Sequence, residues 1–141
     1  MEKDEKMKTT EASSGIDRRP YREPFELRVL VVDDGPDVCF LIRSVLAKNS
    51  IPSDHARNIA TCLSKISSFN PTHIILDINL PDGNGLDALS LIKQRYPHIG
   101  VIMHSALDTR ENREMAKQHK ADGFLKKPLN KNHLLELLKG T

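Results

Sequence analysis

The chain has 141 residues, of which 38% are hydrophobic, and its formal net charge is +2 at pH 7. This length predicts one domain with a single core, and the small charge argues against a general nucleic-acid-binding protein. No stretch is apolar enough to span a membrane and no signal peptide begins the chain, so we expect a soluble, cytoplasmic protein. Cys39 and Cys62 lie far apart, which predicts two separate buried thiols.

Residues 1–24 differ from the remainder of the chain. Half of them are charged, and no sustained apolar periodicity runs through them. Such a segment buries too little surface to offset the entropy of ordering it, so we expect a flexible tail. A partner-binding arm is the alternative. We assign residues 25–141 to the folded domain.

After the tail, short apolar runs alternate with helical patterns. The expected strands are residues 27–32, 51–56, 72–77, 100–104 and 123–126. The expected helices are residues 36–48, 59–67, 85–96, 109–119 and 131–139. Pro36 suits a first helical turn, and Asn130 suits the cap of the last helix. Five alternating units predict an α/β fold, in which helices cover both faces of a parallel sheet.

Polar side chains lie at the carboxyl ends of four of the five expected strands. Asp33 and Asp34 follow the first strand, and Asp77 is the last residue of the third. Ser105 follows the fourth, and Lys127 follows the fifth. Because parallel strands end at one edge of a sheet, where ligands bind in α/β folds, we expect these groups to form one site.

This set of groups suits a metal-assisted phosphoryl transfer. Mg²⁺ or Mn²⁺ prefers carboxylate and phosphate oxygens, and Asp33, Asp34, Asp77 and the backbone carbonyl of Asn79 supply protein oxygens. Asp77 can then attack phosphorus to form an acyl phosphate, with Lys127 and Ser105 binding the transferred oxygens. Taken singly, an aspartate could cap a helix or begin an Asx turn, and a lysine could be solvated. Agreement across four strand ends favours the functional interpretation.

Four segments resemble the receiver domain of two-component response regulators. They are Val31–Asp34, Leu76–Gly85, His104–Ala106 and Ala121–Pro128, and the resemblance covers about residues 26–140. It implies the flavodoxin-like fold of CheY, a five-stranded parallel sheet of strand order 2-1-3-4-5. This strand order comes from the resemblance and not from the sequence pattern.

The resemblance also implies roles for the residues of the expected site. Asp77 would be the phosphoacceptor, and a histidine kinase or phosphotransfer protein would be the donor. Asp33 and Asp34 would be the magnesium-binding acids, and Ser105 and Lys127 would contact the phosphate. Such a domain is not an enzyme in the ordinary sense, because it catalyses only its own phosphoryl transfer and dephosphorylation.

Signal output is implied in the same way. Ser105 and Phe124 would form the switch, and the bond from Lys127 to Pro128 would be cis. The output face would comprise the last two helices and the strand between them. Its partner would be a downstream protein or an output domain absent from this chain, and a phosphorylation-dependent dimer is a further alternative.

Some positions depart from the usual family pattern. Lys120 stands where a glycine usually ends the fourth helix, so we expect that helix end to differ. His104 replaces an aliphatic residue; its side chain should point away from the site, as a structural histidine or as a pH sensor. Basic residues outnumber acidic ones from Arg110 to Lys131, which suggests an acidic partner.

Two other functions are alternatives. A magnesium phosphatase of the haloacid dehalogenase kind also uses a nucleophilic aspartate at a strand end, but it normally has a second aspartate two residues later. Asn79 occupies that position here. A pseudo-receiver would bind partners without phosphate, and the complete acidic set argues against it.

Overall fold

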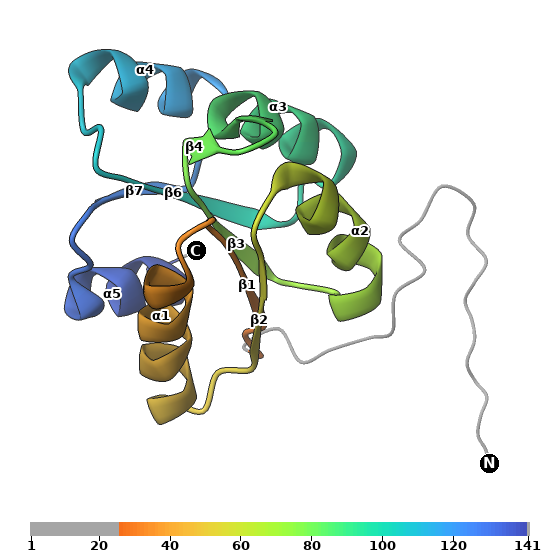
Figure 1. Ribbon diagram of the computed structural model, residues 1–141, viewed down its shortest axis with the longest axis vertical. Coiled ribbons are helices and arrows are strands. Elements are labelled where there is room, and N and C mark those ends of the chain that lie inside the picture. Colours follow the sequence, from red (N-terminus) through yellow and green to blue (C-terminus); the bar gives the residue numbers. More distant parts are fainter. Residues whose placement is uncertain (1–25, 141) are drawn as a thin grey trace.

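The computed structural model describes residues 26–140, and the expected tail, residues 1–24, lies outside them (Figure 1). The strands are β1 Val29–Val32, β2 Ser53–Ala56, β3 His73–Leu76, β4 Asn79–Leu80, β5 Gly83–Asn84, β6 Gly100–Ser105 and β7 Gly123–Lys126. The helices are α1 Pro36–Lys48, α2 Ile59–Phe69, α3 Gly85–Arg95, α4 Arg110–Gln118 and α5 Lys131–Gly140.

The central sheet has five parallel strands in the order β2-β1-β3-β6-β7. With the short β4 and β5 set aside, this is the order 2-1-3-4-5, and the expected α/β fold is confirmed. The sequences of β1 and β3, VLVV and HIIL, are buried throughout. Such continuous apolar runs are typical of strands with helices on both faces.

Two layers of helices cover the sheet. Helices α1 and α5 pack on one face, and α2, α3 and α4 pack on the other (Figure 1). Side chains alternate along β1: Val29 and Val31 join the α1–α5 cluster, whereas Leu30 and Val32 join the other. Both cysteines are buried and unpaired, as expected. Within the described chain no helix has the length and hydropathy needed to cross a bilayer.

The helix ends follow the capping pattern of the sequence. The side chains of Asn58, Asn84 and Thr109 accept hydrogen bonds from backbone N–H groups in the first turns of α2, α3 and α4. Asn130 accepts one from the N–H of His133, which confirms it as a cap. These caps fix where the loops at the carboxyl edge of the sheet end and the helices begin.

One element was not expected and one expectation was wrong. The unexpected element is the antiparallel hairpin β4–β5, which follows Asp77. Lys120 does not alter the end of α4: it adopts φ 69°, the left-handed conformation that a glycine would adopt there. The N–H of Ala121 then donates to the carbonyl of Ala116 at 2.9 Å, so the helix ends normally despite the unfavourable torsion of Lys120.

Candidate functional site

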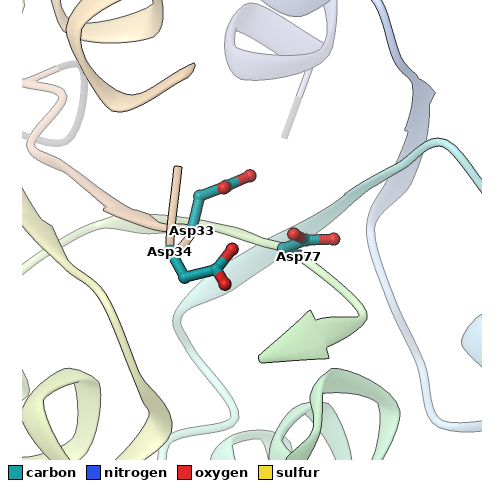
Figure 2. Close-up of side chains that lie close together, drawn as sticks. All are labelled: Asp33, Asp34 and Asp77. Atoms are coloured by element: carbon teal, nitrogen blue, oxygen red, sulfur yellow. The ribbon is translucent and has the colours of Figure 1, made fainter. Parts of the chain in front are cut away.

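Three carboxylates gather beyond the ends of β1 and β3. These strands are neighbours in register, with Val32 opposite Leu76, so the residues that follow them meet. Asp33, Asp34 and Asp77 each place one carboxylate oxygen in a group of three that lie within 4.8 Å of one another (Figure 2). Asp33 and Asp77 are buried and Asp34 is exposed. Their expected proximity is therefore confirmed.

Lys127 lies against the two buried acids. Its Nζ is 2.8 Å from Asp33 Oδ2 and 3.2 Å from Asp77 Oδ2. The residue follows β7, at the far edge of the sheet, and its bond to Pro128 is cis as the resemblance implies. One ammonium thus faces two carboxylates, which leaves negative charge in a partly buried place.

The pKa values reflect this imbalance. Burial and then the charge of Asp33 raise the pKa of Asp77, although Lys127 acts in the opposite direction. Burial lowers the pKa of Lys127, but its hydrogen bond to Asp33 and the charge of Asp77 outweigh burial, and the net shift is upward. The lysine is charged, and the two acids compete for it.

The donor set fits a hard divalent cation. It consists of carboxylate oxygens, and the exposed Asp34 leaves one side accessible to water and phosphate. Asn79, whose carbonyl the sequence analysis added to the set, is exposed in β4, and its N–H lies 3.4 Å from Asp77 Oδ1. The loop that would supply the fourth oxygen thus begins directly beside Asp77.

This loop is fixed at its far end by contacts that sequence reasoning missed. The carboxylate of Asp82 accepts hydrogen bonds from the N–H groups of Ile59 and Ala60, at 2.8 and 3.0 Å, and caps α2. Gly85 approaches the backbone so closely that a Cβ there would lie 1.9 Å from the carbonyl oxygen of Asp77. No local pattern reveals the Asp82 contact, because the acid and the helix are far apart in the chain.

Ser105 ends β6 at the same edge of the sheet. Its backbone carbonyl accepts a hydrogen bond from the N–H of Lys127 at 2.9 Å. Its side chain is buried, and its Oγ accepts one from the N–H of Leu107 at 3.0 Å. The hydroxyl is therefore turned toward its own loop and bonds to none of the three carboxylates in the described chain.

The comparisons with known proteins agree with this geometry. Residues 29–139 match the family described as the response regulator receiver domain. The chain belongs to this family. It is 32% identical to the response regulator protein PilR of Pseudomonas aeruginosa over 79% of its own length, but it spans only 25% of PilR. It is 31% identical to the chemotaxis protein CheY of Bacillus subtilis, covering 81% of this chain and 96% of CheY.

A solved structure gives the same result. The CheY-like receiver domain protein from Methanospirillum hungatei superposes with a TM-score of 0.76 at 27% identity, over 81% of this chain and 91% of that one. Residues 29–139 are thus a receiver domain of the kind found in two-component signalling. Receiver domains are found alone, as in CheY, and within longer regulators, as in PilR.

Phe124 of the receiver domain lies on β7 with 9% of its surface exposed. The guanidinium of Arg113, from α4, covers its ring with Cζ 4.7 Å from the ring centre. The ring is therefore directed into the fold, among the buried residues packed beneath α4.

His104 is buried, and neither ring nitrogen has a hydrogen-bond partner within the described chain. Its neighbour Ile102 packs toward α1 and α5, so strand alternation directs His104 to that face and away from the face of Ser105. Burial, and then the charge of Lys127, lower its pKa to about 4. The ring is uncharged at neutral pH, which favours the structural role.

Proposed function

We propose that this receiver domain accepts a phosphoryl group on Asp77 from a histidine kinase or a phosphotransfer protein. The observation that supports the proposal is the placement of Lys127 Nζ between Asp33 and Asp77. Asp33, Asp34 and Asp77, with the carbonyl of Asn79, would bind Mg²⁺ or Mn²⁺. The ion would supply the positive charge that lets an anionic phosphoryl group approach the carboxylates.

In the chemical step, bonds form and break only between Asp77, the phosphorus atom and the donor. An oxygen of Asp77 attacks phosphorus, the bond from phosphorus to the donor histidine nitrogen breaks, and that nitrogen keeps the electron pair. The Lys127 ammonium, already within 3.2 Å of Asp77, can shift to a phosphoryl oxygen once it appears. The hydroxyl of Ser105 can turn from the N–H of Leu107 to a second oxygen.

Output would follow from this exchange of partners. Ser105 and Phe124 would form the switch, and α4, β7 and α5 would be the face that binds a downstream protein, an output domain or a second copy. The domain would act on no other substrate, so its chemistry would be limited to gain and loss of its own phosphate. Reception of phosphate from a kinase would place it in the cytoplasm.

The test is incubation of the chain with acetyl phosphate and Mg²⁺, followed by intact mass measurement. We expect one phosphate adduct on the parent chain and none on Asp77→Asn. Asp87→Asn, which changes an exposed acid in the first turn of α3, is the matched control and should be phosphorylated normally. An unmodified parent chain would contradict the proposal, and turnover of para-nitrophenyl phosphate would favour the phosphatase alternative.

A further inference from the structure

A continuous set of contacts links Ser105 to Phe124. Ser105 Oγ accepts from the N–H of Leu107, and Asp108 follows directly in the chain. Both oxygens of Asp108 bond to the guanidinium of Arg113, through Nε and, at 3.1 Å, through Nη2. The same guanidinium covers the ring of Phe124.

The geometry points to Arg113 as a positioning residue for the switch. We propose that Arg113 keeps the ring of Phe124 inside the fold, and that Asp108 ties this contact to the loop that follows Ser105. The inference rests on the proposed function, because it gives Ser105 and Phe124 their roles. It adds the residues that connect them.

The chemistry of the contact requires arginine. A guanidinium is planar, so it can stack on a ring with its face while its edge bonds a carboxylate in two places. Lysine offers a point charge and cannot do both. The pKa of Arg113 is raised, foremost by its hydrogen bond to Asp108, and that of Asp108 is lowered by the same bond. The pair therefore stays charged at physiological pH.

This contact alters the interpretation of the basic surface. Arg113 was expected to contribute free positive charge toward an acidic partner, but its charge is paired with Asp108. Reversing that charge would therefore disturb Phe124 as well as any partner. Arg110, one turn earlier, is 90% exposed at its side chain and pairs with Glu114. It is a matched control on the same helix.

The chain contains no tryptophan, so Phe124→Trp provides a single fluorescent reporter. In that background we expect Arg113→Gln and Asp108→Asn to raise the constant for acrylamide quenching of the indole about two- to five-fold. This is the change in the population of the exposed ring that loss of a cation–π contact would cause. Arg113→Lys should behave like Arg113→Gln, and Arg110→Gln should leave quenching unchanged. Equal quenching in Arg113→Gln and Arg110→Gln would overturn the inference.

A second measurement avoids the tryptophan. In the chain with Phe124 intact, the ring should shift the Hε resonance of Arg113 upfield, and Phe124→Leu should abolish that shift. An unshifted Hε in the parent chain would also overturn the inference. Mg²⁺ with fluoroberyllate, a phosphoryl mimic, should change the resonance in the parent and less in Asp108→Asn. If the parent chain did not respond to fluoroberyllate, the proposed function would be contradicted. The Arg113 contact is tested separately, by the upfield shift measured before fluoroberyllate is added.

Discussion

The two buried histidines of the described chain lie at opposite ends of the parallel strands, one at the amino edge of the sheet and one at the carboxyl edge. His73 begins β3, and its Nδ1 lies 2.9 Å from Thr72 Oγ1. His104 lies near the end of β6, and neither of its ring nitrogens has a hydrogen-bond partner among residues 26–140. A buried histidine thus has a hydrogen-bond partner at the amino edge, whereas the buried histidine at the carboxyl edge, where the candidate site lies, has none among the described residues.

Other polar groups follow the same division. At the amino edge the guanidinium of Arg28 donates two hydrogen bonds to the carbonyl of Phe69 and stacks on the ring of Phe69, with Cζ 4.3 Å from the ring centre. The hydroxyl of Thr72 accepts a hydrogen bond from the backbone N–H of Arg28 and donates one to its carbonyl. At the carboxyl edge Asp33 and Asp77 compete for Lys127. Electrostatic strain is therefore concentrated where a ligand can relieve it.

The amino edge has a cost of another kind. Ser50, Asn70 and Lys120 have positive φ angles of 59°, 60° and 69°, and each lies between a helix and the strand that follows it. The cost there is torsional, and no ligand could relieve it. Substitutions that act on one edge alone can test this contrast.

The largest effect is expected for Lys127→Met. It leaves two buried carboxylates without their shared cation, so we expect the free energy of unfolding at pH 7 without metal to fall by about 4 kcal/mol. Urea unfolding measures it. Lys126→Met, the exposed neighbour, should change stability little, and equal losses in the two variants would contradict the electrostatic explanation.

The next effect is the acid sensitivity that His104 confers. Its pKa is about 4 in the fold against 6.5 ordinarily, so the unfolded chain takes up the proton first. The stabilisation is complete above pH 6.5 and is lost as pH falls toward 4. We expect the drop in unfolding free energy between pH 7 and pH 4 to be about 3 kcal/mol smaller in His104→Leu.

The matching change at the other edge sharpens the comparison. His73→Leu removes a ring that is bonded to Thr72, so it should destabilise the protein by about 1 kcal/mol at pH 7. His104→Leu should not destabilise it there, because no hydrogen bond is lost. If both leucine variants lose similar stability at pH 7, the distinction between the two edges fails.

The smallest effect is expected for Lys120→Gly. Glycine removes the torsional cost of the left-handed conformation but adds entropy to the unfolded chain, so we expect a net stabilisation of about 0.5 kcal/mol. Thermal unfolding measures it. Lys120→Ala keeps the Cβ and should gain nothing; a gain equal to that of glycine would mean that the torsion is not the source.

The sequence predicted most of the fold because its signals are local. The apolar runs before Asp33 and Asp77 identify central strands, and Pro36 and Asn130 begin helices where expected. The hairpin after Asp77 was missed because strands of two residues have no periodicity to detect. The expectation at Lys120 was wrong because hydrogen bonds at the end of α4 override the preference of one residue.

The chain order of polar residues at strand ends was enough to predict that Asp33, Asp77 and Lys127 would meet. Only the tertiary structure decided how the charges are shared, that Asp82 caps α2, and that Arg113 covers Phe124. Periodicity and capping depend on neighbouring residues and are written in the sequence. Contacts between distant side chains depend on how helices pack on the sheet, which no local pattern specifies.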